Sequence, residues 1–528
     1  MSISAVALSL PPNALGAPSH YTSWYPHQWK AVQDALDAPT RFVGQCVPTG
    51  GGKSLIAIMM ATLSGMRTCY LTSTKALQDQ VLRDFHITLT DVRGQQNYEC
   101  LNVGDRVSVA DGPCHIGYKC PMKGGGCLYY DQVKAAARSK VVVTNYAYYM
   151  TQLNNEQGAA LGKFDLIVCD EGHLVVDEIT SFMQFAITRQ DCRALEIEMP
   201  NPRPVGVDGW IKWASEVMGK MTVHPVSQYN EQMTGTDLKS AVRRSNEVVQ
   251  ADRKIKKLSS ILDAANWIIC QSDADRIEFS PIWPAKYAER VMYRGADKVM
   301  MMSATLTRKA MFLAGVPTDN YTFTEYPSTY PITNRRVTYI PTVAMNRRAS
   351  DYNISEWVHR IDQILRSRPN RKAIIHTTSY QRMRTLFEAS TERHRMIQHG
   401  SGQTSQAINM FRSYPPSSGA VLVSPVVHSG YDFKGDECRV VIIGKLPFPD
   451  SRDPMVKSRS DRDKEWIPHQ VMQTLIQSAG RATRSGDDWS EIMVIDDDFW
   501  WFWWKYKYLA PGWFVDSVQK SNTIPEPR

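Results

Sequence analysis

The amino-acid sequence predicts an α/β fold with two doubly wound parallel sheets. Short apolar runs of strand length alternate with amphipathic segments of helix length in residues 21–174, and the same alternation returns from residue 291 onward. This pattern is typical of parallel strands joined by crossover helices. The chain of 528 residues is also longer than one hydrophobic core normally organises, so more than one domain is expected.

The first unit opens with strands and helices in strict alternation. A glycine-rich turn separates its first strand from the following helix. We expect helices at 27–36, 53–65 and 75–85, and strands at 41–47, 67–73, 141–144, 164–169 and 299–306.

The second unit repeats the pattern. We expect its strands at 372–379, 419–427, 438–446 and 490–498, with helices between them. The segment 499–514 is too rich in Trp and Tyr for a linker, and we expect it to pack on the second sheet.

Two stretches interrupt the first unit. Residues 99–135 are rich in Gly and Cys, and residues 175–290 have a mostly helical pattern, including apolar positions at helical spacing beside a basic face in 238–269. The predicted division is a flexible N-terminus (1–20), a first parallel-sheet domain in three parts (21–98, 136–174 and 291–325), two insertions (99–135 and 175–290) and a second parallel-sheet domain with an aromatic tail (326–528).

Composition narrows the class of protein only slightly. The net charge of +8 permits a polyanionic partner without demanding one. The sequence contains no run of eighteen or more uncharged apolar residues, so no membrane-spanning helix is expected. Cys69 and Cys169 lie inside apolar strand patterns, where buried free thiols are usual, and this usage indicates a reducing cytoplasm.

The turn after the first strand has the pattern of a phosphate-binding loop. Residues 47–54 read VPTGGGKS, between a strand and a helix, although the generic loop has Gly where this chain has Val47. We expect the backbone N–H groups to bind phosphate, Lys53 to reach the β- and γ-phosphates of ATP, and Ser54 to bind Mg²⁺. The predicted nucleotide-binding residues of the loop are Thr49, Gly50, Gly51, Gly52, Lys53 and Ser54.

A pair of acidic residues supplies the second half of this site. The apolar run 164–169 ends in Asp170 and Glu171, within the sequence DEGH. We expect Asp170 to hold Mg²⁺ and Glu171 to orient or deprotonate the attacking water. Because we expect this strand beside the strand of the phosphate loop, the two patterns together predict a nucleotide triphosphatase.

Two further patterns extend the site. Gln28 lies at the start of the first helix, and its amide has the donor and acceptor needed to bind the edge of adenine. Gln477, Arg481 and Arg484 lie at spacings of four and three residues, which places them on one face of a helix. Arginines from a second domain would neutralise charge on the transferring phosphoryl group.

The order of these motifs resembles the superfamily 2 helicases. The resemblance spans residues 21 to about 515 and is carried by PTGGGKS, LTSTKALQDQ, DEGH, SATL, HSGYDF and QSAGRATR. It implies two RecA-like domains, with Ser303 and Thr305 coupling ATP turnover to strand movement and Asp432 contributing to the cleft. LPFP (446–449) and RSGDDWSEIMVIDDDF (484–499) resemble the XPD/DinG branch in particular.

That branch carries an iron–sulfur insertion where this chain has its cysteine-rich stretch. The resemblance implies that Cys100, Cys114, Cys120 and Cys127 bind a 4Fe–4S cluster, and four thiolates in a short segment suit one. Structural zinc is the alternative, although zinc sites more often have a tight pair of cysteines that is missing here. The same resemblance would make 175–290 the helical arch of the branch.

The resulting expectation is a monomeric, Mg²⁺- and ATP-dependent DNA helicase. It would translocate on single-stranded DNA and unwind forked duplexes, and the 5′→3′ direction is implied by the resemblance alone. Two alternatives stay open. One is a RecQ-type 3′→5′ helicase, disfavoured because no cysteine follows Cys438. The other is an ATP-switched DNA clamp or translocase that does not separate strands.

Overall fold

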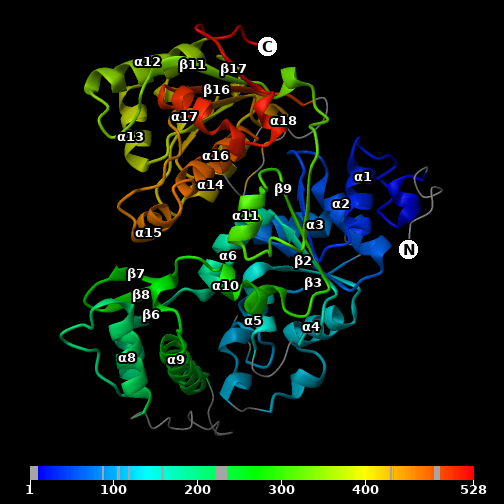
Figure 1. Ribbon diagram of the computed structural model, residues 1–528, viewed down its shortest axis with the longest axis vertical. Coiled ribbons are helices and arrows are strands. Elements are labelled where there is room, and N and C mark those ends of the chain that lie inside the picture. Colours follow the sequence, from blue (N-terminus) through cyan, green and yellow to red (C-terminus); the bar gives the residue numbers. More distant parts are fainter. Residues whose placement is uncertain are drawn as a thin grey trace.

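The structure is a computed structural model with two motor domains and a lobe beside the first (Figure 1). It describes residues 10–85, 89–103, 107–116, 119–155, 160–219, 235–427, 431, 433, 435–480 and 488–528. No helix among these residues is both long and apolar enough to cross a membrane.

The first motor domain is a seven-stranded parallel sheet. Its strands lie in the order β10 (Tyr321–Glu325), β1 (Phe42–Cys46), β9 (Lys298–Ser303), β5 (Leu166–Asp170), β2 (Thr68–Thr72), β4 (Val141–Asn145) and β3 (Thr90–Asp91).

Alternate side chains of these strands enter two different cores. On β9, Met300 and Met302 face one core, and Val299 and Met301 face the other. The first core also contains side chains of α1 (Gln28–Asp37), α2 (Lys53–Ser64) and α3 (Lys75–Phe85). The second contains side chains of α4 (Leu128–Arg138), α5 (Tyr146–Leu153), α6 (Val175–Met183), α10 (Ala285–Ala288) and α11 (Arg308–Leu313).

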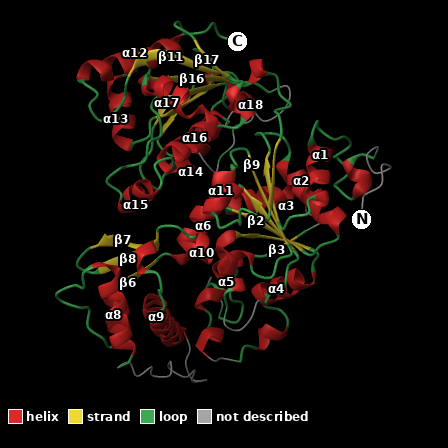
Figure 2. Cartoon of the chain, viewed as in Figure 1, coloured by secondary structure: helices red, strands yellow, loops and turns green. Residues whose placement is uncertain are grey.

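The second motor domain repeats this design, as Figure 2 shows. Its parallel strands are β13 (Met396–Ile397), β14 (Val421–Ser424), β12 (Ala373–His376), β15 (Val440–Ile443), β16 (Glu491–Asp496), β11 (Val337–Val343) and β17 (Val518–Lys520), in that order. One core contains α12 (Asp351–Arg366) and α13 (Tyr380–Ala389); the other contains α14 (Thr404–Ser413), α16 (Trp466–Ala479), α17 (Asp498–Tyr506) and α18 (Gly512–Val515). The predicted fold class, two doubly wound parallel sheets, is confirmed.

The region 175–290 differs from its mostly helical prediction. It contains an antiparallel sheet in the order β6 (Phe185–Thr188), β8 (Arg276–Pro281), β7 (Trp267–Ser272), with α7 (Arg189–Ala194), α8 (Gly206–Met218) and α9 (Gly235–Ser259) beside it. The helical pattern that we extended to residue 269 ends at Ser259, and Leu262 is fully exposed. Strands of this sheet come from both ends of the region, and local periodicity does not reveal such pairing.

The two ends of the chain compare differently with their predicted structure. Residues 10–20, expected to be flexible, contain the short helix η2 (Pro12–Leu15), and Ala17 is buried in the core beside α1 and α2. The aromatic segment packs as expected, because Phe499, Phe502 and Trp503 are buried in the core of the second sheet. Cys69 and Cys169 are buried and free, as predicted.

Candidate active site

The phosphate loop has the backbone that its glycines predict. Gly50 and Gly52 have φ of 74° and 75°, a conformation that favours glycine, and α2 begins at the next residue, Lys53. A Cβ on Gly52 would lie 1.9 Å from Nε2 of Gln28. The loop is therefore a tight turn leading into the N-terminus of a helix, which is the geometry that binds phosphate.

Val47, the residue that departs from the generic loop, has a packing role. Its side chain is buried in the core beneath α2, and its N–H donates to the Ser303 carbonyl at 3.1 Å. This position directly follows the last residue of β1, Cys46, so a valine here fills the core and leaves the glycines to form the turn.

Three different parts of the chain hold the loop. The Gln28 side chain donates to the Gly51 carbonyl at 3.2 Å, and the Tyr330 hydroxyl donates to the Gly50 carbonyl at 2.6 Å. Gly480, just after α16, approaches Thr49 so closely that a Cβ on it would lie 2.9 Å from the threonine hydroxyl.

Gln28 thus contacts the loop directly, and its side-chain oxygen Oε1 accepts from the Tyr25 N–H at 2.8 Å. His27 before it has a φ of 68°, and this left-handed residue starts α1 at Gln28.

The acidic pair lies at the end of β5. Asp170 is buried, and burial, followed by the charge of Glu171, raises its pKa to about 6. The nearby ammonium of Lys53 acts in the opposite direction and lowers that pKa. Glu171 has a φ of 50°, an uncommon value for a side chain of this size, and such backbone strain is frequent in active sites.

The expected neighbourhood of β1 and β5 requires a correction. β9 lies between them and pairs with both, so the strands of the phosphate loop and the acidic pair are not adjacent. As a consequence Ser303, at the end of β9, reaches the acidic pair. Its hydroxyl donates to Oε2 of Glu171 at 3.1 Å and lies 3.3 Å from the Thr305 hydroxyl.

A chain of hydrogen bonds extends from this point to the second motor domain. His173 Nδ1 lies 2.6 Å from the Ser303 hydroxyl and 3.4 Å from Oε2 of Glu171. Its other ring nitrogen is hydrogen-bonded to the Gln477 side chain, on α16. The structure therefore connects Gln477 of one domain to Glu171 of the other through two side chains, and His173 is a residue of this network that we did not single out from the sequence.

A second contact between the domains lies on α15 (Pro454–Arg462). Arg459 is 4% exposed and donates to the Ile282 carbonyl at 2.9 Å and the Thr180 hydroxyl at 3.1 Å. Its guanidinium also lies 5.3 Å from the ring centre of Trp283 and 5.5 Å from that of Trp466. Nothing in the local pattern around Arg459 distinguishes it from a surface arginine.

Three predicted site residues lie outside the described part of the chain. These are Arg481 and Arg484, which follow α16, and Asp432, between β14 and β15.

The four cysteines of the insertion 99–135 are all free thiols. The Cys100 and Cys114 sulfurs flank Gly112, since a Cβ there would lie 3.3 Å and 3.8 Å from them. Burial raises the pKa of Cys114, and Cys100 and Cys120 are close enough to raise it further. In the described residues, however, no three Cys, His, Asp or Glu side chains together form a metal site. Four thiols are suitable ligands for a metal cluster, but among the described residues they are not gathered into one complete ligand set.

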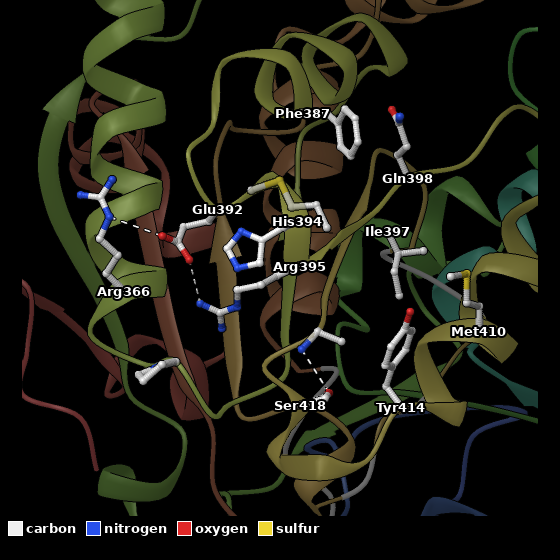
Figure 3. Close-up of a pocket in the computed structure, with 13 residues that line it drawn as sticks. Arg366, Phe387, Glu392, His394, Arg395, Ile397, Gln398, Met410, Tyr414 and Ser418 are labelled. Atoms are coloured by element: carbon white, nitrogen blue, oxygen red, sulfur yellow. Dashed lines mark hydrogen bonds and ion pairs between the residues drawn. The ribbon is translucent and has the colours of Figure 1, made fainter.

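A pocket of about 730 Å³ lies far from this chemistry, at the β13 edge of the second sheet (Figure 3). Its charged groups already pair with one another, because Glu392 is 3.4 Å from Arg366 and 3.3 Å from Arg395. The loop and the acidic pair of the first domain are therefore the candidate nucleotide site.

Comparison with protein families identifies both halves of the chain. The family model described as "DEAD/DEAH box helicase" matches residues 25–196, and the one described as "Helicase C-terminal domain" matches residues 361–515. The first match covers the phosphate loop and the acidic pair, and the second covers α16.

Curated relatives include the Fanconi anemia group J protein homolog of Gallus gallus, 29% identical over 19% of this chain and 9% of that protein. The ATP-dependent DNA helicase YoaA of Escherichia coli K12 is 29% identical over 24% of this chain and 21% of its own length. The YoaA of Haemophilus influenzae is 21% identical, over 85% of this chain and 87% of that protein. The chain thus aligns with only a small part of the first two relatives.

Solved structures show the same fold. One titled "XPD_Helicase" has a TM-score of 0.59 at 15% identity, covering 94% of this chain and 98% of that one. Xpd4 of S. tokodaii has a TM-score of 0.57 at 14% identity, covering 94% and 99%. From the two helicase domains, these relatives and this shared fold, we conclude that the chain belongs to the superfamily 2 helicases of the XPD/DinG branch.

Proposed function

We propose that this protein is an ATP-dependent DNA helicase that translocates on single-stranded DNA and unwinds forked duplexes in the 5′→3′ direction, acting as a monomer. The observation that carries the proposal is the hydrogen-bonded connection from Glu171 through Ser303 and His173 to Gln477. A motor needs a link of this kind, so that hydrolysis in one domain changes how the other is held. The names of the YoaA relatives support DNA as the substrate.

Each site residue then has a chemical role. Bound Mg²⁺–ATP supplies the phosphoryl group whose transfer to water drives the motor. The N–H groups of the loop and the N-terminus of α2 bind phosphate oxygens, and Lys53 neutralises their charge. Ser54 and Asp170 would hold the Mg²⁺. Glu171, aligned by the Ser303 hydroxyl, accepts a proton from the attacking water.

The remaining predicted residues complete the proposed engine. We propose that Arg481 and Arg484 neutralise the charge of the transferring phosphoryl group and that Asp432 contributes to the cleft between the domains. Thr305, with Ser303, would couple ATP turnover to strand movement. Gln28 binds adenine in this proposal. Because its side chain also donates to the Gly51 carbonyl, binding of the base would change a contact of the phosphate loop.

The Lys53→Ala variant tests the engine. Loss of the ammonium should abolish ATP hydrolysis and strand displacement together, and both are measured in the presence of single-stranded DNA. Lys30→Ala is the matched control, because Lys30 is an exposed lysine of α1 that pairs only with Asp34 in the described structure. DNA-stimulated hydrolysis that survives in Lys53→Ala would show that the site assignment is wrong.

Forked substrates with a single tail test direction and strand separation. A duplex with only a 5′ tail should be unwound, whereas one with only a 3′ tail should not. The reverse preference would support a RecQ-like direction. Hydrolysis stimulated by DNA without any displaced strand would identify a translocase or clamp.

We also propose that Cys100, Cys114, Cys120 and Cys127 hold a 4Fe–4S cluster in the insertion 99–135. Support comes from the two sulfurs that flank Gly112 and from the charge coupling of Cys114 with Cys100 and Cys120. Protein purified without oxygen should contain about four irons and a brown chromophore. One zinc per chain would overturn the proposal.

A further inference from the structure

The second motor domain presents a row of aromatic side chains to solvent. Trp501, Trp504 and Tyr508 are 58%, 59% and 63% exposed, although large aromatic side chains are normally covered in a monomer. Together with Lys505 they occupy positions i, i+3, i+4 and i+7, so they share one side of α17 and of the turn that follows it. We refer to these four residues as the aromatic face.

The opposite side of α17 fixes these rings in place. Phe499, Phe502 and Trp503 are buried in the core of the second sheet, so the helix cannot roll to hide its exposed side. Trp500 also packs edge-on against Trp504, with ring centres 5.8 Å apart. The exposed rings are thus held on a rigid support, which lowers the entropy cost of binding a flat ligand.

Positive charge is interleaved with the rings. Nζ of Lys505 lies 5.2 Å from the ring centre of Trp501, and Nζ of Lys507 lies 4.3 Å from that of Trp504. Each ammonium therefore stands next to an exposed indole. A ligand that combines a flat ring with an anionic group at short range would satisfy both.

The aromatic face reaches the boundary between the two motor domains. The Tyr508 hydroxyl donates to Glu465 at 2.6 Å, and Glu465 forms an ion pair with Lys309 of α11, in the first domain, at 3.2 Å. Figure 1 shows α17 beside α16, on the side of the second domain that faces the viewer. A single strand of nucleic acid that runs from one domain to the other along this side would contact the aromatic face where that face reaches the domain boundary.

We propose that the aromatic face, together with the neighbouring Lys507, is a binding surface for single-stranded nucleic acid, with bases stacked on Trp501 and Trp504 and phosphates held by Lys505 and Lys507. The inference rests on the proposed function and adds a contact surface to it. Stacking platforms beside cations are the general means by which proteins hold single strands without reading their sequence. A helical protein partner would instead need a continuous apolar groove, and the lysines interrupt one here.

Binding of a fluorescent oligothymidine to the full-length, nucleotide-free protein tests the proposal. The double variant Trp501→Ala/Trp504→Ala should bind about tenfold more weakly for each ring removed. Trp501→Phe/Trp504→Phe should recover most of the affinity, because phenylalanine also offers a flat ring. Basal ATP hydrolysis should stay unchanged in both variants, since neither ring touches the nucleotide site.

The lysines require a separate readout. In Lys505→Gln/Lys507→Gln, the dependence of log affinity on log salt should fall by about 0.7 for each phosphate that the variant no longer neutralises. A purely structural effect of the substitutions would shift the affinity without changing this slope. For the tryptophan variants, the matched control is Tyr352→Ala, because Tyr352 is a 69% exposed aromatic residue of α12, away from the aromatic face.

The outcomes separate this inference from the proposed function. If wild-type protein binds the strand and the tryptophan variant binds it equally well, the aromatic face is not a strand-binding surface. The same conclusion follows if Tyr352→Ala weakens binding as much, or if the lysine variant keeps the full salt dependence. If the wild-type protein binds no single strand at all, the proposed function itself fails.

Discussion

Two of the contacts between the two motor domains are built differently. Near the phosphate loop, single hydrogen bonds between small polar groups join them, such as those of Gln477 with His173 and of Gln473 with the Thr305 carbonyl at 3.2 Å. At α15, the buried guanidinium of Arg459 lies near two tryptophan rings and donates to three partners across the boundary: the Ile282 carbonyl, the Thr180 hydroxyl and the Asp177 carboxylate.

This difference indicates which contacts ATP can rearrange. A nucleotide in the loop offers oxygens and a base edge that can replace weak polar partners one at a time. A buried cation near two rings has no such substitute, because its release would expose the rings and leave its partners unpaired. We therefore expect the domains to separate at the loop and to stay joined at α15.

The largest effect should follow from Arg459→Ala. Removing the guanidinium removes the donor to the Ile282 carbonyl, the Thr180 hydroxyl and the Asp177 carboxylate, and we expect the free energy of unfolding to fall by about 3 kcal/mol. Denaturant unfolding measures this loss. Arg452→Ala is the control, since Arg452 pairs with Asp450 of its own domain at the surface. Equal stability of both variants would show that α15 does not join the domains.

Acid should weaken the boundary between these two places. His469 of α16 is buried against the Thr307 hydroxyl of the first domain at 2.8 Å, and burial lowers its pKa from 6.5 to about 4. The unfolded chain therefore takes up a proton near pH 6.5, whereas the folded chain does so only near pH 4. Stability should be complete above pH 6.5 and fall by up to about 3 kcal/mol as the pH drops to 4.

The His469→Gln variant checks this dependence, because glutamine can still bond Thr307 but does not titrate. Unfolding is followed at several pH values between 7 and 4 for both proteins. The difference in stability between variant and wild type should change with pH. A constant difference would exclude His469 as the cause.

The smallest effect is expected at the loop itself. Tyr330→Phe removes only the hydroxyl that bonds the Gly50 carbonyl, and one such hydrogen bond contributes about 1 kcal/mol. Because this bond holds the loop in its tight turn, ATP should bind about fivefold more weakly, as titration of a fluorescent analogue can measure. Tyr352→Phe should have no effect. Unchanged affinity in Tyr330→Phe would mean that the loop keeps its shape without the tyrosine.

The parts of the site that the sequence predicted are local ones. The glycines of the loop, Lys53 and the acidic pair each follow a strand within a few residues, and their chemistry is written in consecutive positions. The alternating apolar runs likewise predicted both sheets, since side chains of a strand face opposite sides in turn.

Only the tertiary structure decided which strands and side chains meet. β9 enters between β1 and β5 and brings Ser303 to Glu171, Tyr330 reaches the loop from 280 positions away, and Arg459 reaches Ile282 across 177. Local periodicity carries no information on such partners, because they are selected by how whole elements pack. The sequence by itself determined two parallel sheets and the chemistry at their edges. Packing determined how the two motor domains are joined.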